Sequence, residues 1–149
     1  MAEDIKFRHT MPVQIRFSDV DQFGHMNNSV YFSLYDLAKT TYIKDVLGSA
    51  DWSKLAIVVA NINANFFMPV FFSDHLVIET AVVHLGHKSF TLLQRAVTTD
   101  SHEVKCESRT VMVGYDLATK EPKLISEDYK EAICRYEEKT LEELSKERK

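Results

Sequence analysis

Residues 16–48 read RFSDVDQFGHMNNSVYFSLYDLAKTTYIKDVLG, a polar connection followed by a long apolar segment. The apolar segment predicts a helix that ends at Gly48, because its larger side chains recur at helical spacing. One predicted side carries Val30, Leu34, Leu37 and Ala38, while Tyr31, Phe32 and Tyr35 extend the apolar surface around the rest. A helix that is apolar on most sides is usually buried within a fold. We therefore expect a long buried helix.

The polar connection over residues 16–28 contains two acids, a glycine, a histidine and a pair of asparagines. All of these except the histidine are ordinary turn residues, so one interpretation is a strand-to-helix turn with a helix cap. The other interpretation is a reaction site. The residues alone leave both interpretations open.

Strand patterns flank the predicted helix. Before it, Val13, Ile15 and Phe17 alternate with polar residues and predict a half-buried strand. After it come four segments rich in β-branched and aromatic residues: IVVANINANFF, HLVIETAVVHL, KSFTLLQRAVTTD and EVKCESRTVMVGYD. The last three are separated by connections short enough for hairpins, and hence for antiparallel pairing. From Glu127 onward, apolar residues at helical spacing among many charges predict an amphipathic surface helix.

This order of elements predicts an α+β fold, with an antiparallel sheet wrapped around one helix. No repeat, low-complexity tract or linker interrupts the chain, so we expect residues 1–149 to form a single domain. The sheet would have two edges, and pairing with a second copy of the chain would cover one of them. A homodimer or higher oligomer is therefore expected.

Composition excludes several classes of function. The chain has 22 acids against 18 bases, a net charge of -4, and its scattered bases offer no footprint for nucleic acid. Cys106 and Cys134 lack CxxC spacing, which fits reduced thiols. The first ten residues lack the apolar core of a secretory signal, and no apolar run would span a membrane. We expect a soluble cytoplasmic protein with no bound metal, since His84 and His87 lack further convergent ligands.

Three stretches together resemble a known family. RFSDVDQFGHMNNSVYFSLYDLAK, NANFFMPVFFSDHLVIET and LGHKSF look like the hotdog-fold acyl-CoA thioesterases of the 4-hydroxybenzoyl-CoA thioesterase type, over about Pro12 to Asp116. The resemblance implies a hotdog fold and hydrolysis of acyl-CoA, or acyl carrier protein, thioesters by an oligomer. Coenzyme A would then be part of the substrate, and no separate cofactor is implied.

The resemblance also implies roles for individual residues. Asp21 falls on the family's catalytic carboxylate, Gly24 on its glycine, and Asn28 on the backbone N–H that polarises the thioester carbonyl. Chemistry supports this, because a carboxylate can act as nucleophile or base while free N–H groups at a helix N-terminus stabilise an oxyanion. The alternative for Asp21 is a cap or turn residue.

Further site residues have competing interpretations. His25, in the HMNN form seen in relatives acting on fatty acyl thioesters, either orients Asp21 or substrate or is an ordinary loop histidine. Asn27 would cap the helix beside the substrate, and Tyr31 would contact the substrate from the first helical turn. Asp19 is expected to be structural, and Asp36 is expected to make a buried polar contact.

A second group of residues is assigned to the coenzyme A portion. His87, Lys88 and Ser89 match the family's turn near the coenzyme A phosphates, although a solvated hairpin turn would contain similar residues.

The acyl portion has two candidate surroundings. Asn61, Asn63 and Asn65 share one strand face, which either lines a pocket or faces water. An apolar channel beside Val30, Leu34 and Ala38 would favour straight acyl chains.

Two classes of function remain, with a third less favoured. The first is an enzyme that hydrolyses acyl thioesters, and the second is a non-catalytic acyl-thioester binding or scaffold protein of the same fold. Asp21 favours the enzyme, because a binding module needs no carboxylate beside an electrophile. A hotdog dehydratase would require a His and acid pair placed differently.

Overall fold

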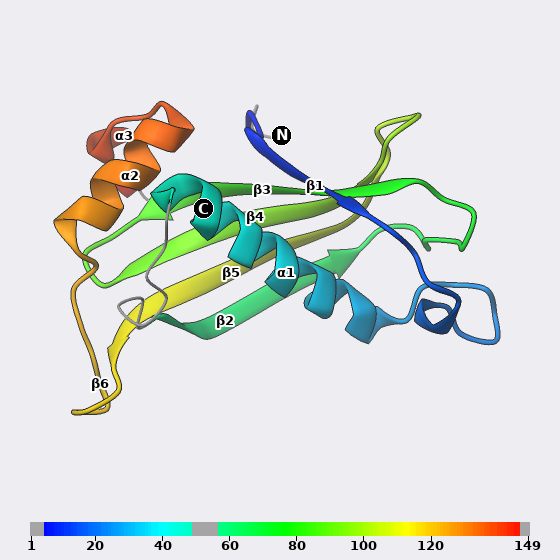
Figure 1. Ribbon diagram of the computed structural model, residues 1–149, viewed down its shortest axis with the longest axis horizontal. Helices are drawn as coiled ribbons and strands as arrows, with labels where there is room; N and C mark the ends of the chain where they lie inside the picture. The colour runs from blue at the N-terminus through cyan, green and yellow to red at the C-terminus, as the bar shows by residue number, and fades with distance from the viewer. Residues whose placement is uncertain (1–4, 49–56, 147–149) are drawn as a thin grey trace. The chain divides into compact units, whose positions relative to one another are not determined.

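The computed structural model describes residues 5–48 and 57–146, and Figure 1 labels their helices and strands. Five strands form an antiparallel sheet in the order β1-β3-β4-β5-β2, and the short strand β6 pairs with β5. The strands are β1 (His9–Val13), β2 (Ile57–Phe66), β3 (Leu76–Leu85), β4 (Ser89–Thr98), β5 (Val104–Asp116) and β6 (Glu121–Pro122). The helices are η1 (Phe17–Asp19), α1 (Asn28–Leu47), α2 (Glu127–Glu137) and α3 (Leu141–Ser145). The α+β prediction is confirmed.

The described residues fall into two compact units, which we describe separately. The first comprises residues up to Tyr42, Ala64–Ala81 and Gln94–Ser108, and the second comprises the remainder. None of the described helices combines the length and apolar composition needed to cross a membrane.

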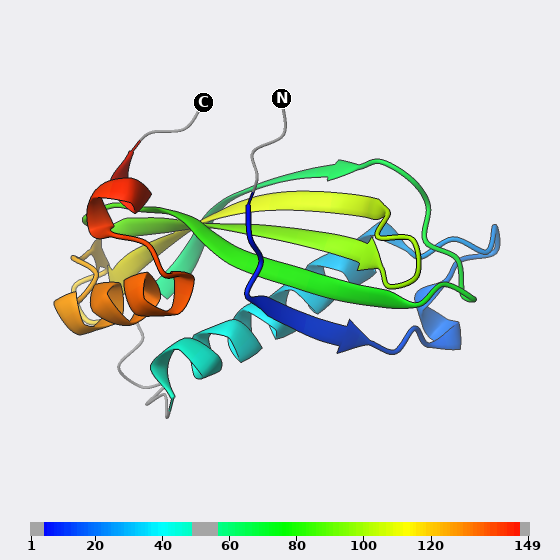
Figure 2. The ribbon, with the colours of Figure 1, turned by 90° about the horizontal axis from the view of Figure 1, so that it is seen from above.

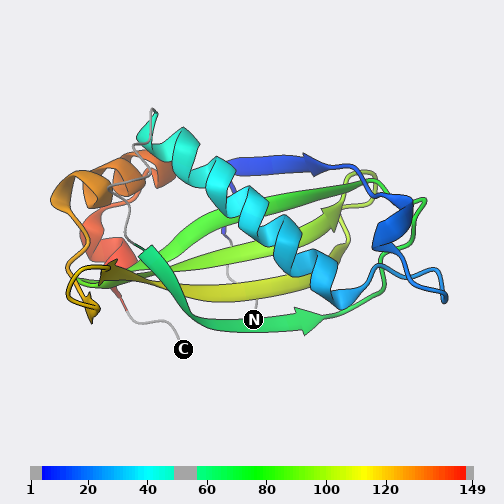
Figure 3. The same ribbon diagram turned by 60° about the horizontal axis from the view of Figure 1, so that its bottom comes forward.

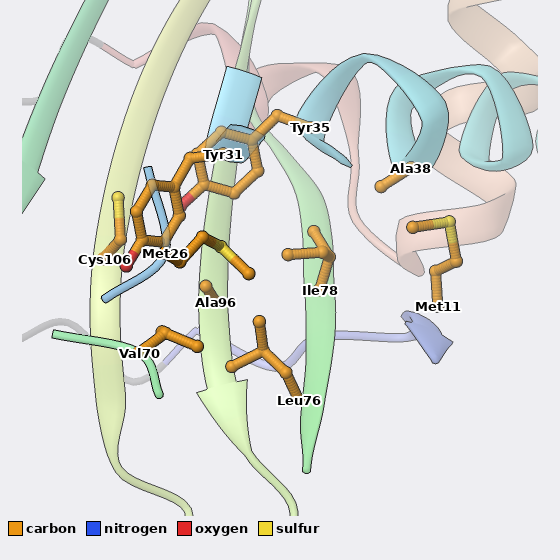
Figure 4. Close-up of a cluster of buried hydrophobic side chains, with 10 residues drawn as sticks. All are labelled: Met11, Met26, Tyr31, Tyr35, Ala38, Val70, Leu76, Ile78, Ala96 and Cys106. Atoms are coloured by element: carbon orange, nitrogen blue, oxygen red, sulfur yellow. The ribbon is translucent and has the colours of Figure 1, made fainter. Parts of the chain in front are cut away.

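The core of the first unit lies between the N-terminal part of α1 and the strands beneath it (Figure 3). Figure 4 shows its buried side chains, which are Met11, Met26, Tyr31, Tyr35, Ala38, Val70, Leu76, Ile78, Ala96 and Cys106. The Gln94 amide, buried on β4, donates hydrogen bonds to the main-chain oxygen of Tyr35 (2.9 Å) and the hydroxyl of Thr80 (3.2 Å). These bonds satisfy polar groups in the core and tie α1 to the sheet.

The core-facing side of α1 differs from the predicted one. The most buried positions are Tyr31, Tyr35, Ala38 and Tyr42, whereas Leu37 is 56% exposed. Both sets of side chains recur at helical spacing, so the pattern alone could not choose between them. The predicted end of the helix is correct, because Gly48 has a positive φ of 78° and its N–H bonds the carbonyl of Lys44 at 2.9 Å.

The first strand lies earlier in the chain than predicted. β1 pairs antiparallel with β3 from His9 opposite Thr80 to Val13 opposite Leu76, and Figure 2 shows the two strands side by side. The predicted strand continued to Phe17, but Phe17 is 84% exposed and begins η1. Pro12 is tolerated in β1 because an edge strand has one side without ladder hydrogen bonds.

In the second unit the C-terminal segment forms two helices rather than the one predicted. Glu138 adopts the left-handed conformation (φ 55°) and ends α2, and Thr140 with Glu143 forms a capping box that starts α3. The ring of Tyr129 on α2 packs against Phe90 on β4, 5.7 Å between centroids. The carboxylate of Glu137 accepts a hydrogen bond from the N–H of Val82 at 3.0 Å, which anchors α2 to β3.

Candidate active site

The connection between β1 and α1 begins with a turn closed by Asp19. The Asp19 carboxylate is buried and accepts hydrogen bonds from the main-chain N–H of Arg16 (2.8 Å) and from its guanidinium (3.0 Å). Burial opposes ionisation of Asp19, but the hydrogen bonds and charge of Arg16 outweigh it and lower the pKa of the carboxyl. The carbonyl of Asp19 also accepts the N–H of Asn27 at 2.9 Å. Asp19 is therefore structural, as expected.

Asp21 closes a second turn, which spans residues 21–25. Its Oδ1 accepts hydrogen bonds from the main-chain N–H groups of Phe23 (2.9 Å) and His25 (3.2 Å), and its own N–H donates to the His25 carbonyl (2.8 Å). Gly24 has a positive φ of 80°, a conformation that suits glycine. The second carboxylate oxygen, Oδ2, has no hydrogen-bond partner among residues 5–48 and 57–146. The turn thus fixes one oxygen of an exposed carboxylate and leaves the other available.

The first turn of α1 is capped by Asn27. Its Oδ1 accepts the N–H and the hydroxyl of Ser29, both at 3.0 Å, and its main-chain oxygen accepts the N–H of Val30 at 3.0 Å. The N–H of Asn28, the first residue of α1, has no hydrogen-bond partner in the described part of the chain. This N–H is therefore a free donor at the positive end of the helix dipole.

Asp21 and Asn28 line one cavity of about 470 Å³ in the first unit. Its other lining residues are His25, Met26, Asn27, Tyr31, Phe66, Phe67, Met68 and Pro69. Burial raises the pKa of Tyr31 to about 12, so its hydroxyl stays protonated at neutral pH. The cavity combines a carboxylate, a free main-chain donor and an apolar wall.

His25 contacts Asp21 through its main chain. Its imidazole packs edge-on against Phe71, 5.2 Å between ring centroids, and the backbones of these two residues form an antiparallel bridge. The imidazole makes no hydrogen bond within the described ranges. An imidazole role in orienting substrate stays a prediction.

His87, Lys88 and Ser89 belong to the second unit, at the turn between β3 and β4. The turn is held by main-chain bonds, from Gly86 N–H to the Ser89 carbonyl (2.8 Å) and from Gly114 N–H to the Lys88 carbonyl (2.8 Å). The side chains of His87 and Lys88 are exposed. The contact of these side chains with coenzyme A stays a prediction.

In the described ranges, no group of three or more His, Cys, Asp or Glu residues could hold a metal ion.

Two expectations about α1 are wrong. Asp36 makes no buried contact, because it is exposed and pairs with Lys39 of the next turn at 3.0 Å. Val30 and Leu34 are not among the residues that line the cavity with Asp21. They line a separate cavity of about 370 Å³, together with residues of β1 and with Asp19 of η1. Both errors come from the orientation of α1 about its axis, which the sheet decides.

Sequence reasoning also missed the cavity wall made by residues 66–69. Phe66 and Phe67 are the last two residues of the predicted strand IVVANINANFF, and Met68 and Pro69 follow it. The available signal was the run of three large apolar side chains directly before a proline, and all three are exposed in the structure. Cys106 is buried, and burial raises the pKa of its thiol, which disfavours the reactive thiolate form.

Comparisons of the chain with known proteins identify a matching family and a similar relative. The family model of the thioesterase-like superfamily matches residues 15–133. The long-chain acyl-CoA thioesterase FadM of Escherichia coli (strain K12) is 26% identical over 124 residues, which cover 81% of this chain and 93% of that protein.

Two solved structures have a similar fold. A thioesterase from Thermus thermophilus, complexed with coenzyme A and Zn, is 26% identical, with a TM-score of 0.81 over 91% of this chain and 98% of that one. A mutant 4-hydroxybenzoyl CoA thioesterase complexed with 4-hydroxybenzoyl CoA is 21% identical, with a TM-score of 0.73 over 83% and 96% of the two chains. The second likeness concerns the fold alone.

Proposed function

We propose that this chain, which belongs to the thioesterase-like superfamily, hydrolyses acyl-CoA thioesters to a free acid and coenzyme A. The resemblance drawn from the sequence and the hotdog fold are both confirmed. Similarity to a long-chain acyl-CoA thioesterase and to a thioesterase solved with coenzyme A supports this substrate class.

One observation carries the proposal: Asp21, which has an unpartnered carboxylate oxygen, and Asn28, which has an unpartnered main-chain N–H, line the same cavity. A thioester carbonyl bound between them would direct its oxygen at the N–H of Asn28 and its carbon toward Asp21. Negative charge that develops on the oxygen is then stabilised by the N–H and by the helix dipole behind it. The positions of these two groups therefore suit acyl transfer.

Asp21 would act through Oδ2, the oxygen without a hydrogen bond. As a general base it takes a proton from water as the water oxygen attacks the carbonyl carbon; the C–S bond then breaks and the thiolate leaves with the proton. As a nucleophile it bonds to the carbonyl carbon while the C–S bond breaks and the thiolate leaves; water then hydrolyses the mixed anhydride to the free acid and the Asp21 carboxyl, whose proton neutralises the thiolate. In either case the main-chain N–H groups of Phe23 and His25 hold the carboxylate through Oδ1, while the N–H of Gly24 closes the same turn on the main-chain carbonyl of Asp21.

The substrate contacts proposed beside the reacting carbonyl come from Asn27, Tyr31 and the wall at residues 66–69. The wall is apolar, so it favours a straight acyl chain, with about 0.8 kcal/mol at most for each CH₂ buried. Lys88, with His87 and Ser89, would bind the phosphates of the nucleotide portion. An acyl carrier protein is the alternative carrier of the same acyl group.

We also propose that a second copy of the chain covers the β2 edge of the sheet. β2 has ten residues and leaves Val58, Val59, Ile62 and Phe66 exposed. A long apolar edge with open N–H and C=O groups pairs readily with another strand. Sedimentation at micromolar concentration should show a dimer or tetramer, and a fully active monomer would contradict this.

The experiment for the enzymatic function is a thiol-release assay with wild type and Asp21→Asn in parallel. Butanoyl-, octanoyl-, palmitoyl- and hydroxybenzoyl-CoA form the substrate panel. We expect wild type to release thiol, with kcat/KM rising along the straight chains until the cavity is full. A protein that binds the panel without releasing thiol would be the non-catalytic alternative. A preference for hydroxybenzoyl-CoA would refute the straight-chain proposal.

A further inference from the structure

The apolar wall of the cavity is attached to Lys105, a buried residue of β5. The carbonyl of Lys105 accepts hydrogen bonds from the N–H groups of Phe67 (2.9 Å) and Met68 (3.2 Å). Both residues line the same cavity as Asp21. The main chain of Lys105 therefore fixes where the wall leaves the sheet.

The ammonium group of Lys105 holds the other end of the same segment. Lys105 is only 5% exposed, and its Nζ lies 2.8 Å from a Glu103 carboxylate oxygen and 3.8 Å from Asp74. It also lies 6.0 Å from the centre of the Phe71 ring. Since a buried ammonium is costly without partners, these carboxylates hold it in one place.

Asp74 connects Lys105 to Phe71, because it contacts both residues. Its carboxylate accepts the main-chain N–H of Phe71 at 2.8 Å, and its own N–H donates to the Phe71 carbonyl at 3.0 Å. Residues 71–74 thus form a closed turn, and the ammonium of Lys105 pairs with the Asp74 carboxylate of this turn at 3.8 Å.

This turn contacts the Asp21 loop directly. Phe71 bridges to His25 through the backbone, and the N–H of Met26 donates to the Val70 carbonyl at 2.7 Å. His25 in turn donates its N–H to Oδ1 of Asp21. An unbroken series of contacts therefore runs from the ammonium of Lys105 to the candidate catalytic carboxylate.

We infer that Lys105 is a positioning residue, which holds residues 66–74 against the Asp21 loop and so sets the carboxylate relative to the N–H of Asn28. The inference rests on the proposed thioesterase function. Lys105 does not line the cavity, so it acts through the wall and not on the substrate. Misplacement of a reacting group by about 1 Å can cost on the order of 100-fold in rate.

Lys130 of α2 offers a matched control. It is 7% exposed and pairs with the carboxylate of Glu127 at 3.8 Å, but it belongs to the second unit. Lys105→Met and Lys130→Met each remove a buried ammonium, so both should lower the free energy of unfolding. A purely structural role for Lys105 predicts that the two variants also behave alike in kinetics.

The experiment measures kcat and KM for octanoyl-CoA and amide hydrogen exchange in wild type, Lys105→Met, Lys105→Arg and Lys130→Met. We expect Lys105→Met to lower kcat by about tenfold or more with KM changed by less than about threefold, because positioning affects the reacting geometry more than binding. The amides of Phe67, Met68, Phe71 and His25 should exchange at least about tenfold faster, because their bonds open more readily. Lys105→Arg keeps the charge and should recover most of kcat, and Lys130→Met should leave kcat unchanged.

Equal kcat in Lys105→Met and wild type, or unchanged exchange at those amides, would overturn the inference. If Lys105→Met does not fold, Glu103→Gln replaces it, since Glu103 is the nearer carboxylate and is partly exposed. Glu103→Gln should lower kcat and speed exchange at the same amides. If either kcat or the exchange rates were unchanged in this variant, the inference would also be overturned. If wild type hydrolyses no thioester, the proposed function fails, and the exchange data alone decide whether Lys105 holds the wall.

Discussion

Asp19 and Asp21 stand two residues apart in the same connection, yet their environments differ. Both oxygens of Asp19 are bonded to Arg16, and the carboxylate is buried. Asp21 is exposed, uses one oxygen to close its turn and leaves the other without a partner among the described residues, and it lines the same cavity as Asn28. A carboxylate whose oxygens are all bonded stabilises the connection, whereas one with a free oxygen can react.

The largest effect should follow from Asp21→Asn. The asparagine carbonyl can still accept the N–H groups of Phe23 and His25, so the turn should persist, but the negative charge is lost. We expect kcat to fall by about 100-fold or more, with a change in unfolding free energy below about 0.5 kcal/mol. Steady-state kinetics and urea unfolding measure the two quantities.

If Asp21→Asn kept more than about a tenth of the wild-type kcat, Asp21 would not be the catalytic group, and His25 would be the next candidate. Asp21→Ala serves as the comparison, because it removes the turn acceptor as well as the charge. It should destabilise the protein more than Asp21→Asn while losing activity to a similar extent.

The second prediction concerns the N–H of Asn28. Asn28→Pro removes this donor, yet proline suits the first position of a helix, so α1 should still form. Loss of one oxyanion donor lowers kcat by about 100-fold or more. Asn28→Ala is the control, since it removes the side chain and keeps the N–H. If both variants were equally active, the main-chain donor would have no part in catalysis.

Asp19→Asn should show the opposite pattern to Asp21→Asn. It disrupts the bonds that close the 16–19 turn, and we expect a loss of about 1 kcal/mol in unfolding free energy, typical of a lost cap. The kcat should stay within about threefold of wild type, because Asp19 does not line the cavity with Asp21. If Asp19→Asn lost its activity but kept the stability of wild type, Asp19 would be the catalytic acid and not the structural one.

The smallest expected effect concerns pH. It is the change with pH of the difference in unfolding free energy between wild type and Asp19→Asn. The folded-state pKa of Asp19 lies below its usual value of 3.8, so its ionised form stabilises the fold fully above that pH. The contribution is lost as the pH falls through the lower, folded-state pKa. Urea unfolding from pH 7 to pH 2 should therefore show wild type and Asp19→Asn converging in acid, and a constant gap would contradict the prediction.

The sequence predicted the strands after α1 better than the strand before it. β3, β4 and β5 lie where the apolar segments indicated, because short connections leave consecutive strands little choice of partner. β1 was placed about four residues too late. Its position depends on pairing with β3, far along the chain, and on the Arg16–Asp19 turn, which removes residues 17–19 from any strand.

The break between α2 and α3 was present in the sequence but was overlooked. Thr140 and Glu143 have the spacing of a capping box, which marks the start of a new helix. Apolar residues continue at helical spacing on both sides of the break, so periodicity alone suggested one helix. A local hydrogen-bonding motif gave the better signal here.

By itself the sequence determined the α+β order of elements, the limits of α1 and the set of polar residues from Asp19 to Asn28, because these depend on local periodicity and turn chemistry. Only the tertiary structure decided which face of α1 is buried, and which residues join Asp21 in lining the cavity. These features depend on contacts between segments distant in the chain, such as Lys105 with Asp74 and Phe71 with His25. No local pattern encodes such contacts, since the free energy that selects them comes from packing and hydrogen bonds formed when the segments meet.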